Sequence, residues 1–282
     1  MFRAIFGNIL QSFGTVFWKK TLLVSRLPKL LFRFFWEING LVIAIIVMWL
    51  SWFERSIFLN MRIVGGVVLT LILDLWYDYI QQWLYREEKI STMMPYENLN
   101  CVFVIVIWYL IFRDASLIAV GVSILVIIIT ILFSIDFKKF ELPKNIKKIL
   151  FVQVLITLET LLTWYFLKDL ADKDYFVVYQ IVIVIMLLFP LLFNKLFGAV
   201  KKMGKSFLWY GSLSATANNI SFLLYLFLVS EFGVVISMLL SFLGDGITIL
   251  FWFLFLKEKP SKKEVLLIVL TTLLVGVGFY FK

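Results

Sequence analysis

Residues 115–135 read ASLIAVGVSILVIIITILFSI, a run without one charged side chain. The hydrocarbon core of a bilayer takes about 20 apolar residues per helical span. Similar runs recur along the whole chain, in which 62% of the 282 residues are hydrophobic and the mean hydropathy is +0.99. Soluble domains contain about 45–50% apolar residues. The sequence therefore predicts an all-α, polytopic membrane protein.

Apolar windows of about 20 residues predict ten transmembrane helices. They cover residues 4–25, 31–53, 61–85, 90–112, 115–135, 147–167, 175–194, 204–229, 232–256 and 263–281. Charged pairs such as Glu54-Arg55 and Arg113-Asp114 mark the turns, because a helix in contact with lipid rarely carries them. The longest polar connection, from Asp136 to Lys148, divides five spans from five.

A faint internal repeat has an offset of about 144 residues. Residues 109–117, YLIFRDASL, and residues 253–262, FLFLKEKPSK, close corresponding spans, and Asp74 falls opposite Asn218. Because each half has an odd number of spans, the halves insert upside down relative to each other. We therefore predict two inverted five-helix repeats, residues 1–140 and 141–282, with a binding site between them near the bilayer midplane.

The final part of each half resembles the EamA branch of the drug/metabolite transporter superfamily. The segment 256–261, LKEKPS, is followed in the last span by 273–277, LLVGV, and the opening span runs from Gly7-Asn8 to FWKK at 17–20. The family usually has Gly-Glu where this chain has Arg113-Asp114. The resemblance implies a ten-span secondary transporter with both termini in the cytoplasm.

The positive-inside rule gives the opposite orientation. Roughly 20 of the 27 Lys and Arg residues lie in the connections after odd-numbered spans, counted with the flanking span ends. This tally places those connections in the cytoplasm and both termini outside it, so the two arguments leave the absolute orientation open. In either orientation both termini share one side of the membrane, and the expected location is a bacterial or archaeal cytoplasmic membrane.

Four acidic residues lie deep within predicted spans: Asp74, Asp78, Glu159 and Asp245. An ionised group at the bilayer centre costs at least about 2.5–3.5 kcal/mol, so each needs a partner, a wet cavity or a proton. The spacing of Asp74 and Asp78 places both on one helix face. These acids either line a transport cavity or bond neighbouring helices together.

Other polar and aromatic residues extend the candidate site. Amides need several hydrogen-bond partners, and aromatic rings beside polar positions can bind cations. The candidates for substrate binding or coupling are Asp245, Glu159, Asp74, Asp78, Asn218, Asn219, Gln11, Asn98, Trp18 and Tyr210. Their distribution predicts that spans one, three, four, six, eight and nine surround a central cavity, with spans five and ten outside it.

Among the four acids, Asp245 and Glu159 are predicted to carry coupling or substrate charge. Asp245 lies between two glycines, which leave room for a ligand. Glu159 has no basic residue within one turn, and its polar neighbours there are threonines. Asp74 and Asp78 can share a proton or bond Gln81 and Gln82, so they form a more self-contained unit.

Composition narrows the function. The chain has no histidine, which excludes a Ser-His-Asp triad and removes the commonest metal ligand. We expect no cofactor, no metal, no nucleic-acid partner and no enzymatic activity. The predicted inverted repeats and the resemblance to the drug/metabolite transporters imply secondary transport of a small polar or amphiphilic metabolite. The acid-rich interior favours a cationic or zwitterionic substrate, such as an amino acid or a quaternary amine. The expected partner is the bilayer, and the candidate coupling ion is a proton. The alternatives are a flippase for a lipid or polyprenyl phosphate and, ranked last, an intramembrane prenyltransferase of the UbiA type.

Overall fold

The computed structural model describes most of the chain. The described residues are 2–24, 29–51, 53, 57–58, 60–87, 99–113, 116–134, 145–167, 170–193, 204–241, 247, 250–256, 262, 265–266, 269–270, 273–274, 277 and 280. Within these ranges every long element is a helix and no strand occurs. The predicted all-α class is thus confirmed.

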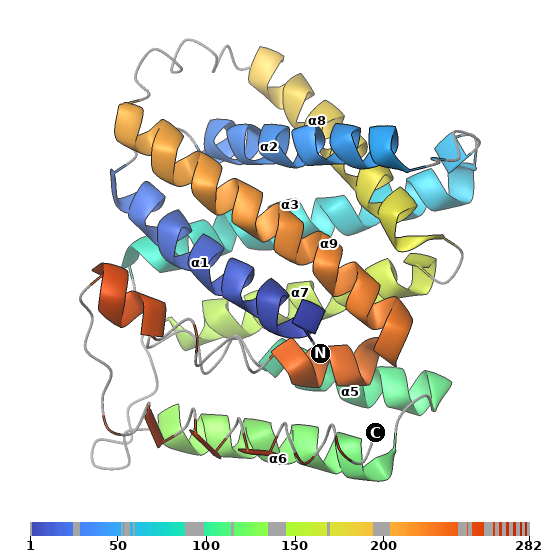
Figure 1. Cartoon of the computed structure of the whole chain (residues 1–282), viewed down its shortest axis with the longest axis vertical. Helices are drawn as coiled ribbons and strands as arrows, with labels where there is room; N and C mark the ends of the chain where they lie inside the picture. The colour runs from blue at the N-terminus through green and yellow to red at the C-terminus, as the bar shows by residue number, and fades with distance from the viewer. Residues whose placement is uncertain are drawn as a thin grey trace.

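The helices are long, and successive ones alternate in direction across the molecule (Figure 1). They are α1 (Phe2–Val24), α2 (Lys29–Leu50), α3 (Met61–Glu87), α5 (Leu99–Phe112), α6 (Leu117–Ser134), α7 (Ile146–Leu167), α8 (Asp172–Phe193) and α9 (Lys205–Ser241), followed by the π-helical turn η3 (Trp252–Leu256). For α1, α2, α3, α6, α7 and α8 both bounds lie within three residues of those of a predicted span. The predicted start of the fourth span, at residue 90, lies outside the described residues, and α9 continues past the boundary predicted between spans eight and nine. α8 begins three residues earlier than expected, with Asp172 and Asp174 in its first turn, where acidic side chains complement the helix dipole.

Five helices of the described part are long and apolar enough to cross a membrane. They are Leu30–Leu50, Met61–Leu84, Ile146–Phe166, Asp172–Phe193 and Phe207–Val234. The protein is therefore a multi-pass integral membrane protein.

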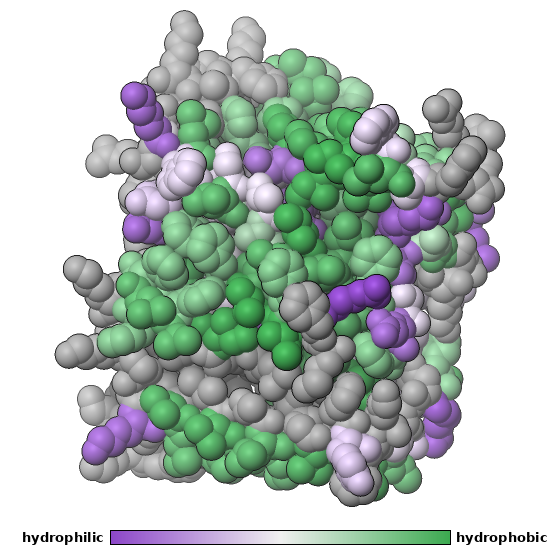
Figure 2. Space-filling model, viewed as in Figure 1, coloured by the Kyte–Doolittle hydropathy of each residue, from purple (hydrophilic) through white to green (hydrophobic). Residues whose placement is uncertain are grey.

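The outer surface fits this placement. Large apolar side chains are exposed on several helices, among them Ile45, Phe189 and Leu192. Figure 2 shows hydrophobic residues across the face formed by α1 and α9, with most hydrophilic side chains toward its two lateral margins. A soluble monomer rarely exposes a continuous apolar surface of this extent, whereas a membrane protein covers it with lipid.

The interior is a closely packed set of helix pairs. The most extensive packing joins α1 to α9 and α3 to α7, and α2 packs on both α8 and α9. α6 packs on α5 and α9 and lies at the edge of the bundle (Figure 1), as predicted for span five. The prediction for span ten concerns residues that are described only in part.

The helix α9 is broken at Gly233, which has φ 79° and ψ 169°. Figure 1 shows the chain reversing there, so that the last part of α9 returns toward α5. The sequence places the boundary between spans eight and nine at Ser230-Glu231. The break falls slightly later because only glycine readily adopts this backbone conformation.

Replacing Gly233 by Ala is expected to destabilise the fold by about 1–3 kcal/mol, because a Cβ strains this conformation. The thermal midpoint of the detergent-purified protein should fall by roughly 2–10 °C. The matched control is Gly121→Ala, a helical position with open space around an added Cβ, where the midpoint should hold or rise slightly. Equal midpoints for the two variants would contradict the conclusion that the break in α9 requires a glycine at this position.

Candidate functional site

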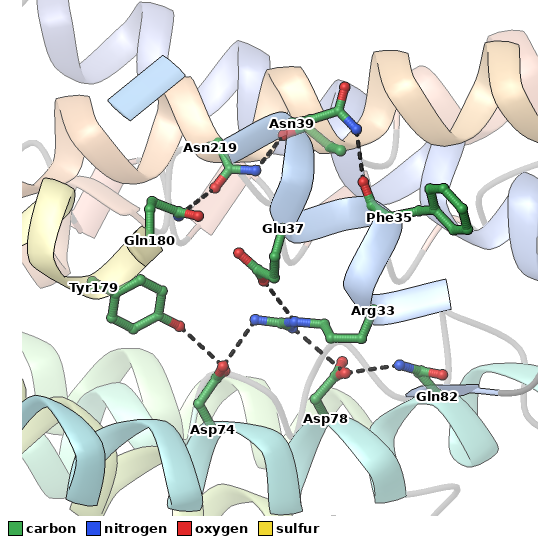
Figure 3. A network of polar contacts seen from close by, with 11 residues as sticks. Arg33, Phe35, Glu37, Asn39, Asp74, Asp78, Gln82, Tyr179, Gln180 and Asn219 are labelled. Carbon is green, nitrogen blue, oxygen red and sulfur yellow. Dashed lines mark hydrogen bonds and ion pairs between the residues drawn. The ribbon is translucent and has the colours of Figure 1, made fainter. Parts of the chain in front are cut away.

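A buried ion-pair cluster joins α2 to α3. The guanidinium of Arg33 lies 2.6 Å from Glu37 Oε1 through Nε, 2.8 Å from Asp74 Oδ2 and 3.5 Å from Asp78 Oδ2 through its terminal nitrogens (Figure 3). The i, i+4 spacing of Arg33 and Glu37 places them on one face of α2, and the same spacing aligns the two aspartates on α3. We call these four residues the acid cluster.

Neutral donors also bind the two aspartates. Tyr179 of α8 donates its hydroxyl hydrogen to Asp74 Oδ2 at 2.9 Å, and Gln82 Nε2 donates to Asp78 Oδ2 at 2.7 Å. The predicted bond between Gln82 and Asp78 is therefore present. Through Tyr179 the contacts of the acid cluster extend to a third helix, α8.

The acid cluster carries one positive charge and three negative charges, a formal sum of −2 when all four groups are ionised. Its side chains are buried: 13% of Arg33 is exposed and 2–3% of each carboxylate side chain. Buried charges that lack a partner are expensive. This site is consequently suited to take up protons or a positively charged group.

A chain of amides lies beside the acid cluster. Gln180 Nε2 of α8 donates to Asn219 Oδ1 of α9 at 2.8 Å, and Asn219 Nδ2 donates to the carbonyl oxygen of Ala215 at 2.9 Å. Gly40 of α2 allows this contact, because a Cβ there would collide with Gln180 and Asn219. The amides thus join α8 to α9 and lie against α2, one turn along from Glu37.

Glu159 of α7 is surrounded by hydroxyl groups. Thr163 donates to Glu159 Oε1 at 2.9 Å, Thr160 donates to Oε2 at 3.4 Å, and Tyr175 of α8 donates to Thr163 Oγ1 at 3.1 Å. No ion pair joins Glu159 to a described residue. α7 packs on α3, the helix that carries Asp74.

The other predicted site residues are dispersed. Asn218 is half-buried and faces Gly14 of α1. Trp18 is half-buried, with its ring 4.9 Å from that of Trp36. The remaining positions follow: Gln11 is exposed on α1, Tyr210 lies beneath the ammonium group of Lys20 at 4.5 Å, and Asp245 and Asn98 are outside the described residues.

The acid cluster, its hydrogen-bond partners Tyr179 and Gln82, and the neighbouring Gln180–Asn219 pair together form a network of eight side chains. Half of them come from two helices that were not predicted to line the cavity. α2 provides Arg33 and Glu37, and α8 provides Tyr179 and Gln180. Arg33, near the start of α2, was not among the predicted site residues, and its three carboxylate partners stabilise its charge inside the protein. The signal for this pair was its i, i+4 spacing at the start of the second span.

Comparison with known proteins identifies a shared fold and no family. No family model and no curated protein matches the chain. The chain is similar to a solved structure described as "Crystal structure of protein", with a TM-score of 0.63 over 99% of this chain and 96% of that one. The two sequences are 10% identical, so this likeness concerns the fold alone.

Proposed function

We propose that this protein is a secondary-active transporter of a small cationic or zwitterionic metabolite, with alternating access around a site between its two halves. The observation that carries the proposal is the acid cluster, in which one guanidinium faces three buried carboxylates. An intramembrane ionisable group is expensive to retain and commonly marks a substrate or proton pathway. Here the excess charge is negative, which favours a cation.

The packing of the helices supports an inverted repeat of five spans. An offset of about 144 residues relates α1 to α7, α2 to α8 and α3 to the first part of α9. If each helix is replaced by its counterpart, the α1–α9 contact corresponds to the α7–α3 contact, and the α2–α9 contact corresponds to the α8–α3 contact. The α2–α8 contact corresponds to itself. All these contacts are present. They favour ten spans in two halves, the arrangement that the resemblance to EamA transporters implies.

The two alternative functions need charged groups that, in this site, already bind other side chains of the protein. A flippase for phosphate-bearing lipids needs an available cation, whereas Arg33 is bound by three carboxylates. A prenyltransferase of the UbiA type needs carboxylates that are available to Mg²⁺ and diphosphate, whereas Asp74 and Asp78 bind Arg33 and neutral donors. Both alternatives are therefore less well supported than cation transport.

The proposal is tested by uptake into proteoliposomes that contain the full chain. We expect at least one labelled cationic or zwitterionic compound, from a panel of amines, amino acids and amino alcohols, to accumulate above the level in protein-free liposomes. Sugar phosphates and dicarboxylates should remain at that level, because the site repels anions. Accumulation of anions alone, or of no compound in a panel that covers all these classes, would contradict the proposal.

A further inference from the structure

The orientation of the Gln180 side chain is fixed by its neighbours. The carbonyl oxygen of Ala215 can only accept, so Asn219 must direct its Nδ2 toward it and its Oδ1 toward Gln180. Gln180 must in turn offer Nε2 to Asn219 Oδ1. Its remaining atom, Oε1, is therefore an acceptor.

The Oε1 atom of Gln180 has no hydrogen-bond donor among the described residues, and the residue is 1% exposed. It lies against Gly40 of α2, the residue whose added Cβ would collide with it. Because residue 40 is a glycine, the Gln180 oxygen can lie directly against the backbone of α2.

A second buried acceptor belongs to Glu37 of α2, one turn before Gly40. Glu37 is three residues before Gly40, and residues at this spacing are neighbours on a helix surface. Its Oε1 is held by Arg33, whereas its Oε2 has no donor among the described residues, and Glu37 is also 1% exposed. Figure 3 shows the Glu37 carboxylate and the Gln180 amide on the same side of α2, with the Arg33 guanidinium below both in this view.

Two buried acceptors without a donor define the chemistry of a ligand. Buried polar atoms are nearly always hydrogen-bonded, and here the missing groups are donors that carry positive charge, because the acid cluster has excess negative charge. A metal ion fits less well, since no group of three or more His, Cys, Asp or Glu residues suited to hold one occurs in the described part of the chain. A quaternary ammonium lacks N–H groups altogether.

We propose that Glu37 Oε2 and Gln180 Oε1 bind the N–H groups of a primary ammonium, so that the substrate is a primary amine or an amino acid and not a quaternary amine. This inference rests on the proposed transport function and specifies the substrate class for the same site. The ammonium donates one hydrogen to each oxygen and reduces the formal charge of the cluster from −2 to −1.

The test is a methylation series measured by thermal stabilisation of the full chain in detergent, since a ligand that binds the folded state raises its stability. The probes are ethanolamine and its N-methyl, N,N-dimethyl and trimethyl derivatives, and in parallel glycine and its mono-, di- and trimethyl derivatives. At least one unmethylated parent should stabilise the protein. Its trimethyl derivative should bind about tenfold more weakly or worse, because hydrogen bonds to charged groups are lost.

Variants of the acceptors localise the effect. Gln180→Leu removes Oε1 and should abolish the preference for the unmethylated parent over its dimethyl derivative, which keeps a single N–H. Gly40→Ala, whose Cβ displaces Gln180, should give the same result if Gln180→Leu does not fold. The matched control is Gln153→Leu on α7, because Gln153 is also 1% exposed and its Oε1 also lacks a donor among the described residues. It should keep the wild-type preference.

Equal or tighter binding of the trimethyl derivatives would overturn the inference, and so would a preference for the unmethylated parent that persists in both Gln180→Leu and Gly40→Ala. It would also be overturned if neither series bound, or if sodium chloride stabilised the protein more than potassium chloride while the amines did not stabilise it. Uptake into proteoliposomes separates this result from the proposed function. Transport of quaternary amines would leave the transport function intact while refuting the inference. Binding of primary amines without any transport would do the reverse.

Discussion

Replacing Arg33 by Met should destabilise the protein by about 3–5 kcal/mol, which is the effect of removing one partner from a buried ion pair. Three carboxylates would remain buried without a cation, and Met restores the apolar volume but not the charge. We expect the midpoint of thermal unfolding in detergent, followed by tryptophan fluorescence, to fall by roughly 10 °C.

The control for this variant is an exposed ion pair of the same chemistry. Arg3 lies 3.4 Å from Glu231, and these side chains are 59% and 50% exposed, so Arg3→Met should cost less than about 1 kcal/mol. Adding Asp74→Asn and Asp78→Asn to Arg33→Met should recover much of the lost stability, because it removes two of the unpaired charges. If Arg33→Met is no more harmful than Arg3→Met, the acid cluster is not a buried charge network.

Replacing Asp74 by Asn should reduce uptake of the transported cation by about tenfold or more, because it removes one negative charge from the acid cluster that attracts the cation. Stability should change little by comparison. The amide oxygen can still accept from Tyr179, and Arg33 keeps two carboxylates. A large functional loss at near-wild-type stability is the signature of a carboxylate that acts on the substrate.

The matched control for this variant is Asp172→Asn. Asp172 lies at the start of α8, is half-buried, and accepts a hydrogen bond from Ser230 at 2.6 Å, away from the acid cluster. Uptake by Asp172→Asn should stay within about twofold of wild type, since a peripheral hydrogen bond contributes little. Equal losses in the two variants would assign the effect of Asp74 to general disturbance of the protein.

The all-α, membrane-spanning class was predictable because a helix that crosses a bilayer needs a long apolar run and satisfies its backbone hydrogen bonds internally. The predicted bounds of the span 61–85, for example, differ from those of α3 by at most two residues. The hinge at Gly233 was missed by a few residues, since Ser230-Glu231 is the more polar position whereas the backbone bends where glycine permits it.

The site was predictable only in part. Depth in the span identified Asp74 and Asp78, and their shared face followed from helical periodicity. Arg33 was counted among the basic residues of the first connection, because it lies close to the start of its span. Its contact with Asp74 joins two helices, and such contacts are not encoded in the local pattern of one segment.

The helices α2 and α8 were omitted for a related reason. Each offers few polar residues to a count by span, yet α2 and α8 pack on each other, so that single residues such as Glu37 and Gln180 meet. Asp245 lies outside the described residues, and the ranking of Asp245 and Glu159 above Asp74 and Asp78 stays a prediction.

The most direct test of a negatively charged transport site is substrate counterflow in proteoliposomes. Liposomes are loaded with an unlabelled amine or amino acid from the panel above, and entry of the labelled compound is followed without any ion gradient. The account predicts transient, saturable accumulation for a cationic or zwitterionic compound, competition by other amines, and loss in Asp74→Asn but not in Asp172→Asn. Counterflow of an anionic metabolite that persists in Asp74→Asn would contradict it.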